Sequence, residues 1–291
     1  MAALDLRPLS LGEILDRTFS LYRSHFLLFV GITAIPQLAI LAVRLAQLLI
    51  FGYVGTTRID PTRTALSGGM AAVALLSSLI ATIVYVIAYL YAQGGTVLAV
   101  SELYLGRPTT IGESFGRMRG RAMNLFGVTF LNGIAVVVGL ILLIVPGVWL
   151  ACRLITCVPA ALLEDLGARD SLERSYRLTE DSAGRAFVIY FIYFLMAIIA
   201  ASLFTYPFDF MMALSLRTHP DSVRMWLAFV QVGNSIAETL VTPILLIATA
   251  VFYYDLRVRK EAFDLQLMMN PGAAGSAGAP PPPGTLPSML S

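Results

Sequence analysis

Charge is scarce in this chain. Only 13% of its 291 residues are charged, whereas about a quarter is usual for a soluble domain. Hydrophobic residues make up 57%, and the mean hydropathy is +0.78. So few charged groups cannot cover a water-facing surface, and lipid is therefore the expected solvent. The net charge of +2 also argues against bulk electrostatic attraction to nucleic acid, which is not expected as a partner.

Histidine and cysteine are almost absent, and their scarcity removes several classes of chemistry. His25 and His219 fall at opposite predicted membrane faces, so they cannot form a dyad or a metal site. Cys152 and Cys157 are five residues apart in an apolar run, which fits neither a disulfide scaffold nor a CxxC motif. The sequence contains no HExxH, P-loop or Ser–His constellation. We therefore expect no enzyme activity, no metal and no cofactor.

Long apolar runs dominate the chain, and about 20 such residues are enough to cross a bilayer. Six spans are predicted, at 26–50, 71–100, 124–145, 148–163, 186–206 and 226–254. Pro146-Gly147 predicts a tight hairpin between the third and fourth spans, and Pro159 predicts a kink in the fourth. The sequence from Asn270 onward is rich in Pro, Gly and Ala and predicts disorder. The expected organisation is a six-span membrane domain at 1–268 and a disordered cytoplasmic tail at 269–291.

Basic residues lie mostly on one side of these spans. Fourteen of them precede the first span, follow the last, or lie in the connections after the second and fourth, and four lie on the other side. The positive-inside rule then places both termini in the cytoplasm. Nineteen arginines against one lysine are typical of a GC-rich bacterial genome. We expect a multi-pass protein of the bacterial cytoplasmic (inner) membrane.

Three short amphipathic segments, at 11–21, 111–118 and 170–178, resemble one another. Ser10 and Thr110 each precede a glutamate by three residues, which predicts a capping box. Each segment also has an acid four residues before an arginine, a spacing that predicts an ion pair on one helix face. These pairs are Glu13 with Arg17, Glu113 with Arg117, and Asp170 with Arg174. The predicted fold is all-α, a polytopic membrane protein with six transmembrane helices in three repeats of amphipathic elbow helix plus transmembrane hairpin.

Polar side chains recur at helical spacing inside the predicted spans, where they are costly and usually face protein or water. Glu238 lies about 18 Å along its span from Trp226, near mid-bilayer. An unpaired charge there costs about 2.5–3.5 kcal/mol, so we hypothesise that Arg153 and Glu238 pair or share a hydrated cavity. Asp209 is similarly a candidate partner of Arg44. The candidate cavity residues are Tyr85, Tyr89, Gln93, Arg153, Asp209, Gln231, Asn234 and Glu238. Alternatively, the polar stripes only hold helices together by hydrogen bonds.

Three segments carry a family resemblance. Residues 7–16 (RPLSLGEILD) resemble the opening of membrane proteins related to the membrane domain of glycerophosphoryl diester phosphodiesterase. The run 146–150, with Arg153, Glu164 and 171–179, looks like the middle motif of that family, and 252–265 is similar to its closing motif. The resemblance covers about residues 5–268. In the enzymes that give the family its name, a separate soluble barrel carries the chemistry, so the resemblance implies the membrane part without the catalytic domain.

Two functions stay open at this point. The first is a non-enzymatic integral membrane protein that binds or moves a lipid or small amphiphile in an intramembrane polar cavity. The second is a membrane scaffold or assembly factor that acts through its cytoplasmic elbow helices. Membrane lipids are expected partners in both cases, and a protein partner on the cytoplasmic side belongs to the second.

Overall fold

The structure, a computed structural model, describes residues 8–51, 68–218 and 222–261, so His219 and the predicted tail lie outside it. Within these residues there is no strand, which confirms the predicted all-α class. The helices are α1 (Leu11–Ser24), α2 (Phe26–Phe51), α3 (Gly68–Tyr104), α4 (Ile111–Arg117), α5 (Ala122–Leu142), α6 (Ile144–Arg153), α7 (Cys157–Leu163), α8 (Ala168–Leu178), α9 (Ala183–Phe204), α10 (Tyr206–Thr218) and α11 (Val223–Glu261).

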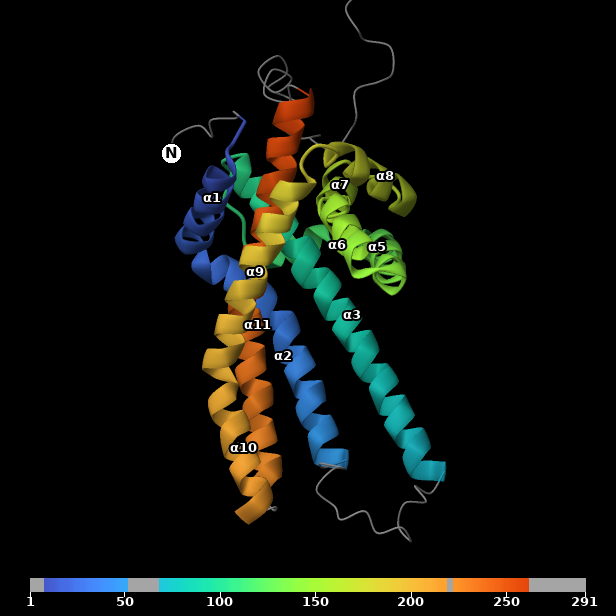
Figure 1. Cartoon of the computed structure of the whole chain (residues 1–291), viewed down its shortest axis with the longest axis vertical. Helices are drawn as coiled ribbons and strands as arrows, with labels where there is room; N and C mark the ends of the chain where they lie inside the picture. The colour runs from blue at the N-terminus through green and yellow to red at the C-terminus, as the bar shows by residue number, and fades with distance from the viewer. Residues whose placement is uncertain (1–7, 52–67, 219–221, 262–291) are drawn as a thin grey trace, which may run out of the picture.

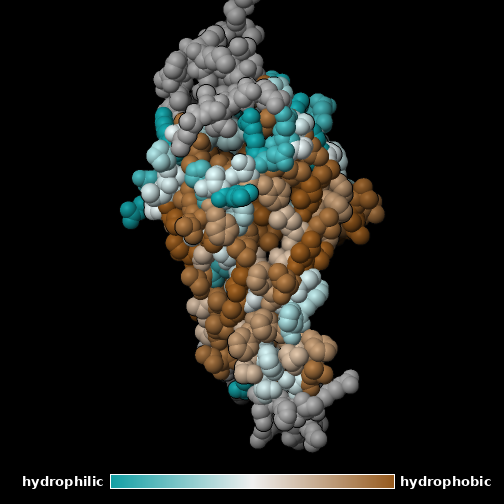
Figure 2. Space-filling model, turned by 90° about the vertical axis from the view of Figure 1, so that its left-hand side faces the viewer, coloured by the Kyte–Doolittle hydropathy of each residue, from teal (hydrophilic) through white to brown (hydrophobic). Residues whose placement is uncertain are grey.

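The described residues include six helical stretches long and apolar enough to cross a membrane, which agrees with the six predicted spans. They are Phe26–Leu49, Leu75–Tyr104, Ala122–Leu142, Ile144–Leu163, Ala183–Phe204 and Val223–Glu261. With 39 residues, α11 is about 58 Å long, roughly twice the hydrocarbon core of a bilayer. Its charged C-terminal end therefore extends beyond the apolar layer. Figure 2 shows apolar residues around the middle of the molecule and hydrophilic ones gathered near its upper end.

Most of the long helices run lengthwise, and the short ones gather at one end. In Figure 1, α2, α3, α9, α10 and α11 follow the long axis, while α1, α7 and α8 surround the C-terminal end of α11. The α5–α6 hairpin is foreshortened in this view and stands to one side. The central helix is α11, which packs against α1, α2, α3, α9 and α10. The main apolar core lies at the end where the short helices meet α11 and includes Ile14, Val97, Leu162 and Val251.

The three predicted amphipathic helices are present as α1, α4 and α8, and both predicted capping boxes are confirmed. At α1, the Ser10 amide donates to Glu13 Oε2 (2.6 Å) and the Glu13 amide donates to Ser10 Oγ (3.3 Å). Thr110 and Glu113 repeat this arrangement at α4. Each box satisfies amides that a helix start leaves without partners. The threefold repeat itself stays a prediction.

The hairpin between α5 and α6 turns at Leu143, so its predicted position at Pro146-Gly147 was wrong. Leu143 is extended (φ −163°, ψ 149°), and Pro146 and Gly147 lie in the first turn of α6. Proline is tolerated there because the first amides of a helix have no partner within it. Gly147 allows the two helices to touch, since a Cβ added to it would lie 2.6 Å from the Leu140 backbone nitrogen.

The fourth span is interrupted. Helix α6 ends at Arg153, and α7 begins at Cys157 with Pro159 in its first turn. The ten residues of α6 measure about 15 Å, half the thickness of the hydrocarbon core. Every residue of α7 is buried. The predicted kink is thus a break at residues 154–156, which leaves Arg153 at the end of a short helix.

Substitution of Gly147 tests the hairpin contact. We expect Gly147→Val to destabilise the protein by about 1–3 kcal/mol, the usual cost of overpacking, because its Cβ would collide with the backbone of α5. Gly133→Ala is the control, since a Cβ there meets no atom within 4 Å. The measurement is the temperature at which half of the detergent-solubilised protein leaves the monodisperse peak. Equal temperatures for native protein and Gly147→Val would contradict the close approach.

Candidate functional site

A cavity of about 240 Å³ lies between α2, α3, α9 and α11, and it collects three of the predicted site residues, Tyr85, Tyr89 and Glu238. Helix α2 adds Gln37 and α9 adds Tyr193, neither of which the sequence analysis singled out. Both belong to spans without a continuous polar stripe at that depth, so periodicity gave no signal for them. The cavity thus has polar groups on all four of its helices.

Glu238 is the charged group of this cavity. Gln37 donates from Nε2 to Glu238 Oε2 at 2.6 Å. Glu238 precedes Asp255 by 17 residues of one helix, so it lies about 25 Å from the charged end of α11. Glu238, Tyr85 and Tyr89 are all exposed, so the cavity opens on the side of the bundle. A carboxylate and an amide are therefore accessible at bilayer depth, where polar groups are costly.

Arg153 does not join Glu238, so the hypothesised ion pair or shared cavity is not formed. Its guanidinium lies 3.9 Å from the Tyr176 ring centroid and 5.4 Å from that of Trp149. The side chain is buried, and no described residue accepts a hydrogen bond from its Nε. The rings provide cation–π attraction instead of a carboxylate. The break after α6 explains the separation, because it holds Arg153 beside α8.

The remaining predicted residues do not line the Glu238 cavity. Gln93 faces α5, where Thr129 donates to its Oε1 at 3.5 Å. Asp209 lies in the first turn of α10, and among the described residues no ion pair joins it to Arg44. Gln231 and Asn234 are half-buried on α11. The polar stripes therefore serve both purposes considered above, a cavity around Glu238 and contacts between helices elsewhere.

A buried ionic cluster, which the sequence analysis did not predict, lies where α11 meets the short helices. Glu164 is its centre, with 3% of its side chain exposed. Both carboxylate oxygens of Glu164 accept from Arg174 Nε (2.8 and 3.0 Å), and Tyr253 donates its hydroxyl to Oε1 at 2.5 Å. Arg174 also pairs with Glu261. Burial lowers the pKa of Arg174, but the Glu164 and Glu261 carboxylates outweigh it and raise the pKa, so the guanidinium stays charged.

Asp255 forms a second buried centre and is fully enclosed. Its carboxylate accepts from Arg185 Nη2 at 2.8 Å and Arg259 Nε at 3.0 Å, and from the Leu9 amide at 2.6 Å. Arg185 also donates to the Leu9 carbonyl at 2.9 Å. The segment before α1 is thereby bound to α9 and α11. The available signal was Asp255 within the run YYDLRVRKE, which the sequence analysis used as a basic flank and as part of the closing motif, without assigning Asp255 a contact.

Arg17, Arg117 and Arg174 of the short helices each contact a side chain outside their own helix, and among the described residues no ion pair joins them to the predicted acids. Arg117 pairs with Glu102 of α3, and Arg174 pairs with Glu164 and Glu261. Arg17 donates to the Tyr104 hydroxyl at 3.4 Å. The corresponding acids lie in the first helical turns, where Glu13 and Glu113 complete capping boxes and Asp170 faces the positive end of the α8 dipole. Local spacing identified the charges correctly but not their partners.

Comparison with known proteins finds a family model that matches part of this chain. Residues 125–268 match the family model described as the membrane domain of glycerophosphoryl diester phosphodiesterase. The match confirms the resemblance seen in the middle and closing motifs, and it includes Glu164, Arg174 and Asp255. The opening motif at 7–16 lies outside the matched segment. No curated protein and no solved structure matches the chain.

The Asp255 centre gives a direct stability prediction. We expect Asp255→Asn to cost about 3–5 kcal/mol, because it leaves buried arginine charge without its carboxylate. Asp181→Asn is the control: that side chain is 86% exposed and lies 3.7 Å from Lys260, so its loss changes stability by less than about 1 kcal/mol. Thermal unfolding in mild detergent provides the comparison. Similar midpoints for the two variants would show that Asp255 does not hold the chain together.

Proposed function

Because residues 125–268 match that membrane-domain family, we propose that this integral membrane protein is non-enzymatic and binds, or moves, a lipid or small amphiphile in the Glu238 cavity. The observation that carries the proposal is the Glu238–Gln37 pair, which is accessible from the side of the bundle. Such a pair at bilayer depth is costly unless a polar group of a ligand offsets the lost water.

The cavity's size and opening favour an amphiphile over a water-soluble compound. Its volume of about 240 Å³ is below the ~300–1,000 Å³ typical of sites that enclose a small molecule. It can therefore hold a polar group while the rest of the ligand stays in the bilayer. Glu238 accepts hydrogen bonds and Tyr85 and Tyr89 carry donor hydroxyls, so a headgroup with hydroxyl or amine functions fits this lining.

The alternative, a scaffold acting through the elbow helices, has less support from the contacts. Arg117 and Arg174 are bound to acids of the same chain, and Arg177 pairs with Glu173 on the surface of α8. Charge that is already paired contributes little to the capture of a partner. The cavity is therefore the stronger candidate.

We also propose that the end carrying the ionic clusters faces the bacterial cytoplasm. The side chains of Arg177 and Arg224 lie near opposite ends of the bundle and are exposed, whereas Cys152 and Cys157 are buried and give little background. We expect a membrane-impermeant maleimide to label Arg177→Cys in inside-out vesicles and Arg224→Cys in intact spheroplasts. The reverse pattern would overturn the proposed orientation.

Glu238→Gln tests the proposed binding site. The substitution keeps the size of the side chain but removes its charge, and a hydrogen bond to a charged group contributes about 1.5–3 kcal/mol. We expect a lipid or metabolite enriched on the native protein to fall about tenfold or more on the variant. Mass spectrometry of species retained in mild detergent measures this loss.

Glu180→Gln is the matched control, because Glu180 is exposed among the short helices and lies outside the cavity lining. It should retain the native profile. Native and Glu238→Gln profiles that both equal the bulk membrane lipid would refute the binding proposal. The search would then move to protein partners of the elbow helices.

A further inference from the structure

A larger hollow lies between the α5–α6 hairpin and α9, with a volume of about 500 Å³. We call it the hairpin groove. It falls within the ~300–1,000 Å³ typical of ligand sites. Its walls are mainly apolar and include Val136, Val148, Phe187, Phe191 and Phe194. The residues described as lining it differ from those lining the Glu238 cavity, so the two hollows are separate.

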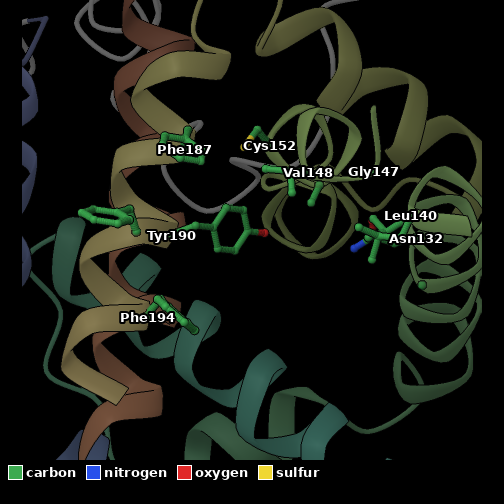
Figure 3. A pocket seen from close by; sticks show the side chains of 12 residues that line it. Asn132, Leu140, Gly147, Val148, Cys152, Phe187, Tyr190 and Phe194 are labelled. Carbon is green, nitrogen blue, oxygen red and sulfur yellow. The ribbon is translucent and has the colours of Figure 1, made fainter. Parts of the chain in front are cut away.

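Two polar side chains face this apolar space. Figure 3 shows the Tyr190 hydroxyl extending from α9 towards α6, while the Asn132 amide points from α5 towards the same space. The Asn132 Oδ1 atom is buried, and no described residue donates a hydrogen bond to it. Within the described chain the Tyr190 hydroxyl likewise makes no hydrogen bond. Buried polar groups are normally hydrogen-bonded, so the Asn132 Oδ1 acceptor indicates a missing donor from a ligand. The Tyr190 hydroxyl offers that ligand a donor in the same space.

The depth of the pair limits what that ligand can be. Tyr190 follows Arg185 by five residues of α9, and Arg185 is anchored to Asp255 in the charged cluster. Tyr190 therefore lies about 7.5 Å further into the apolar layer, near the boundary between headgroups and acyl chains. None of the described residues that line the groove is charged. A ligand with a long apolar body, an uncharged acceptor for Tyr190 and a hydroxyl donor for Asn132 matches the two groups at this level.

We propose that the hairpin groove binds one acyl chain of a glycerolipid, whose ester carbonyl accepts a hydrogen bond from the Tyr190 hydroxyl and whose free glycerol hydroxyl donates one to Asn132 Oδ1. Lipid is the solvent of these helices, and the groove opens beside Phe191 and Phe194, which are 49% and 58% exposed. The chain enters from the bilayer through this opening. The proposal concerns a site separate from the Glu238 cavity and does not rest on it.

Gly133 offers a way to close the groove without disturbing the protein. It lines the groove, and a Cβ placed on it would meet no atom within 4 Å. Leucine is also a better helix former than glycine. Gly184→Leu on α9 is the matched control, since its Cβ also has open space and Gly184 does not line the groove.

The probe is a phosphatidylglycerol with a diazirine in one acyl chain, mixed into nanodiscs with the full protein. We expect photolabelling to concentrate on α5, α6 and α9. Gly133→Leu should reduce labelling there about tenfold, while Gly184→Leu keeps the native yield. Labels spread evenly over the lipid-facing helices and unchanged by Gly133→Leu would overturn the proposal, as would crosslinks from the groove to a second copy of the chain.

A competition with unlabelled lipids tests recognition of the carbonyl. The ester-linked lipid should compete better than its ether-linked analogue, which has no ester carbonyl. Tyr190→Phe removes only the hydroxyl, and it should reduce this preference about fivefold, the equivalent of one hydrogen bond of about 1 kcal/mol. Equal competition by both lipids on the native protein would refute the hydrogen bond to the carbonyl. Glu238→Gln should leave labelling of the hairpin groove unchanged, because Glu238 does not line it. The experiment on the groove therefore gives a result that does not depend on whether the Glu238 cavity binds a ligand.

Discussion

The buried carboxylate of Asp255 is the interaction on which the arrangement of the helices depends. A charge removed from water must be matched by nearby charges and donors, and here the matching groups come from three separate parts of the chain: Leu9, Arg185 and Arg259. Leu9 leads into α1 and α2, Arg185 begins α9, and Arg259 belongs to α11. One carboxylate therefore determines where these elements meet, and Glu164 does the same for α7, α8 and α11 through Arg174 and Tyr253.

The position of the Glu238 cavity follows from these anchors. The ends of α1, α9 and α11 are held together by the Asp255 centre. Further along α11, helices α1 and α2 contact it directly. The Tyr22 hydroxyl donates to the Leu240 carbonyl at 2.9 Å, and Thr33 Oγ1 donates to the Thr239 carbonyl at 3.1 Å. Both acceptors are neighbours of Glu238 in sequence. The first two helices are thus held beside the carboxylate by backbone groups, which leaves its side chain available to Gln37 and to the opening.

Properties set by short stretches of sequence were predictable, and properties set by distant contacts were not. Hydropathy gave the spans, and the Ser10–Glu13 spacing gave a capping box, because both depend on neighbours within one helix. The Pro146-Gly147 turn was misplaced because the same pair also fits the first turn of a helix. The partner of Arg174 could not be read locally, since Glu164 and Glu261 lie on other elements. Glu238 was singled out from the sequence, yet its hydrogen-bond partner Gln37, 201 positions away, was not.

The buried and membrane-depth polar groups are of two kinds: some have their partners inside the protein, and others face a hollow. This difference indicates their role. Asp255 and Glu164 have their partners inside the protein and therefore hold the fold together. Arg153 is buried and has an Nε to which no described acceptor is bound, but the Trp149 and Tyr176 rings contact its guanidinium, and it lines neither of the two hollows. Glu238 and the Tyr190–Asn132 pair instead face open hollows of about 240 and 500 Å³. Since unsatisfied polar groups in an apolar medium cost free energy, a lipid that supplies the complementary atoms gains affinity at these two places.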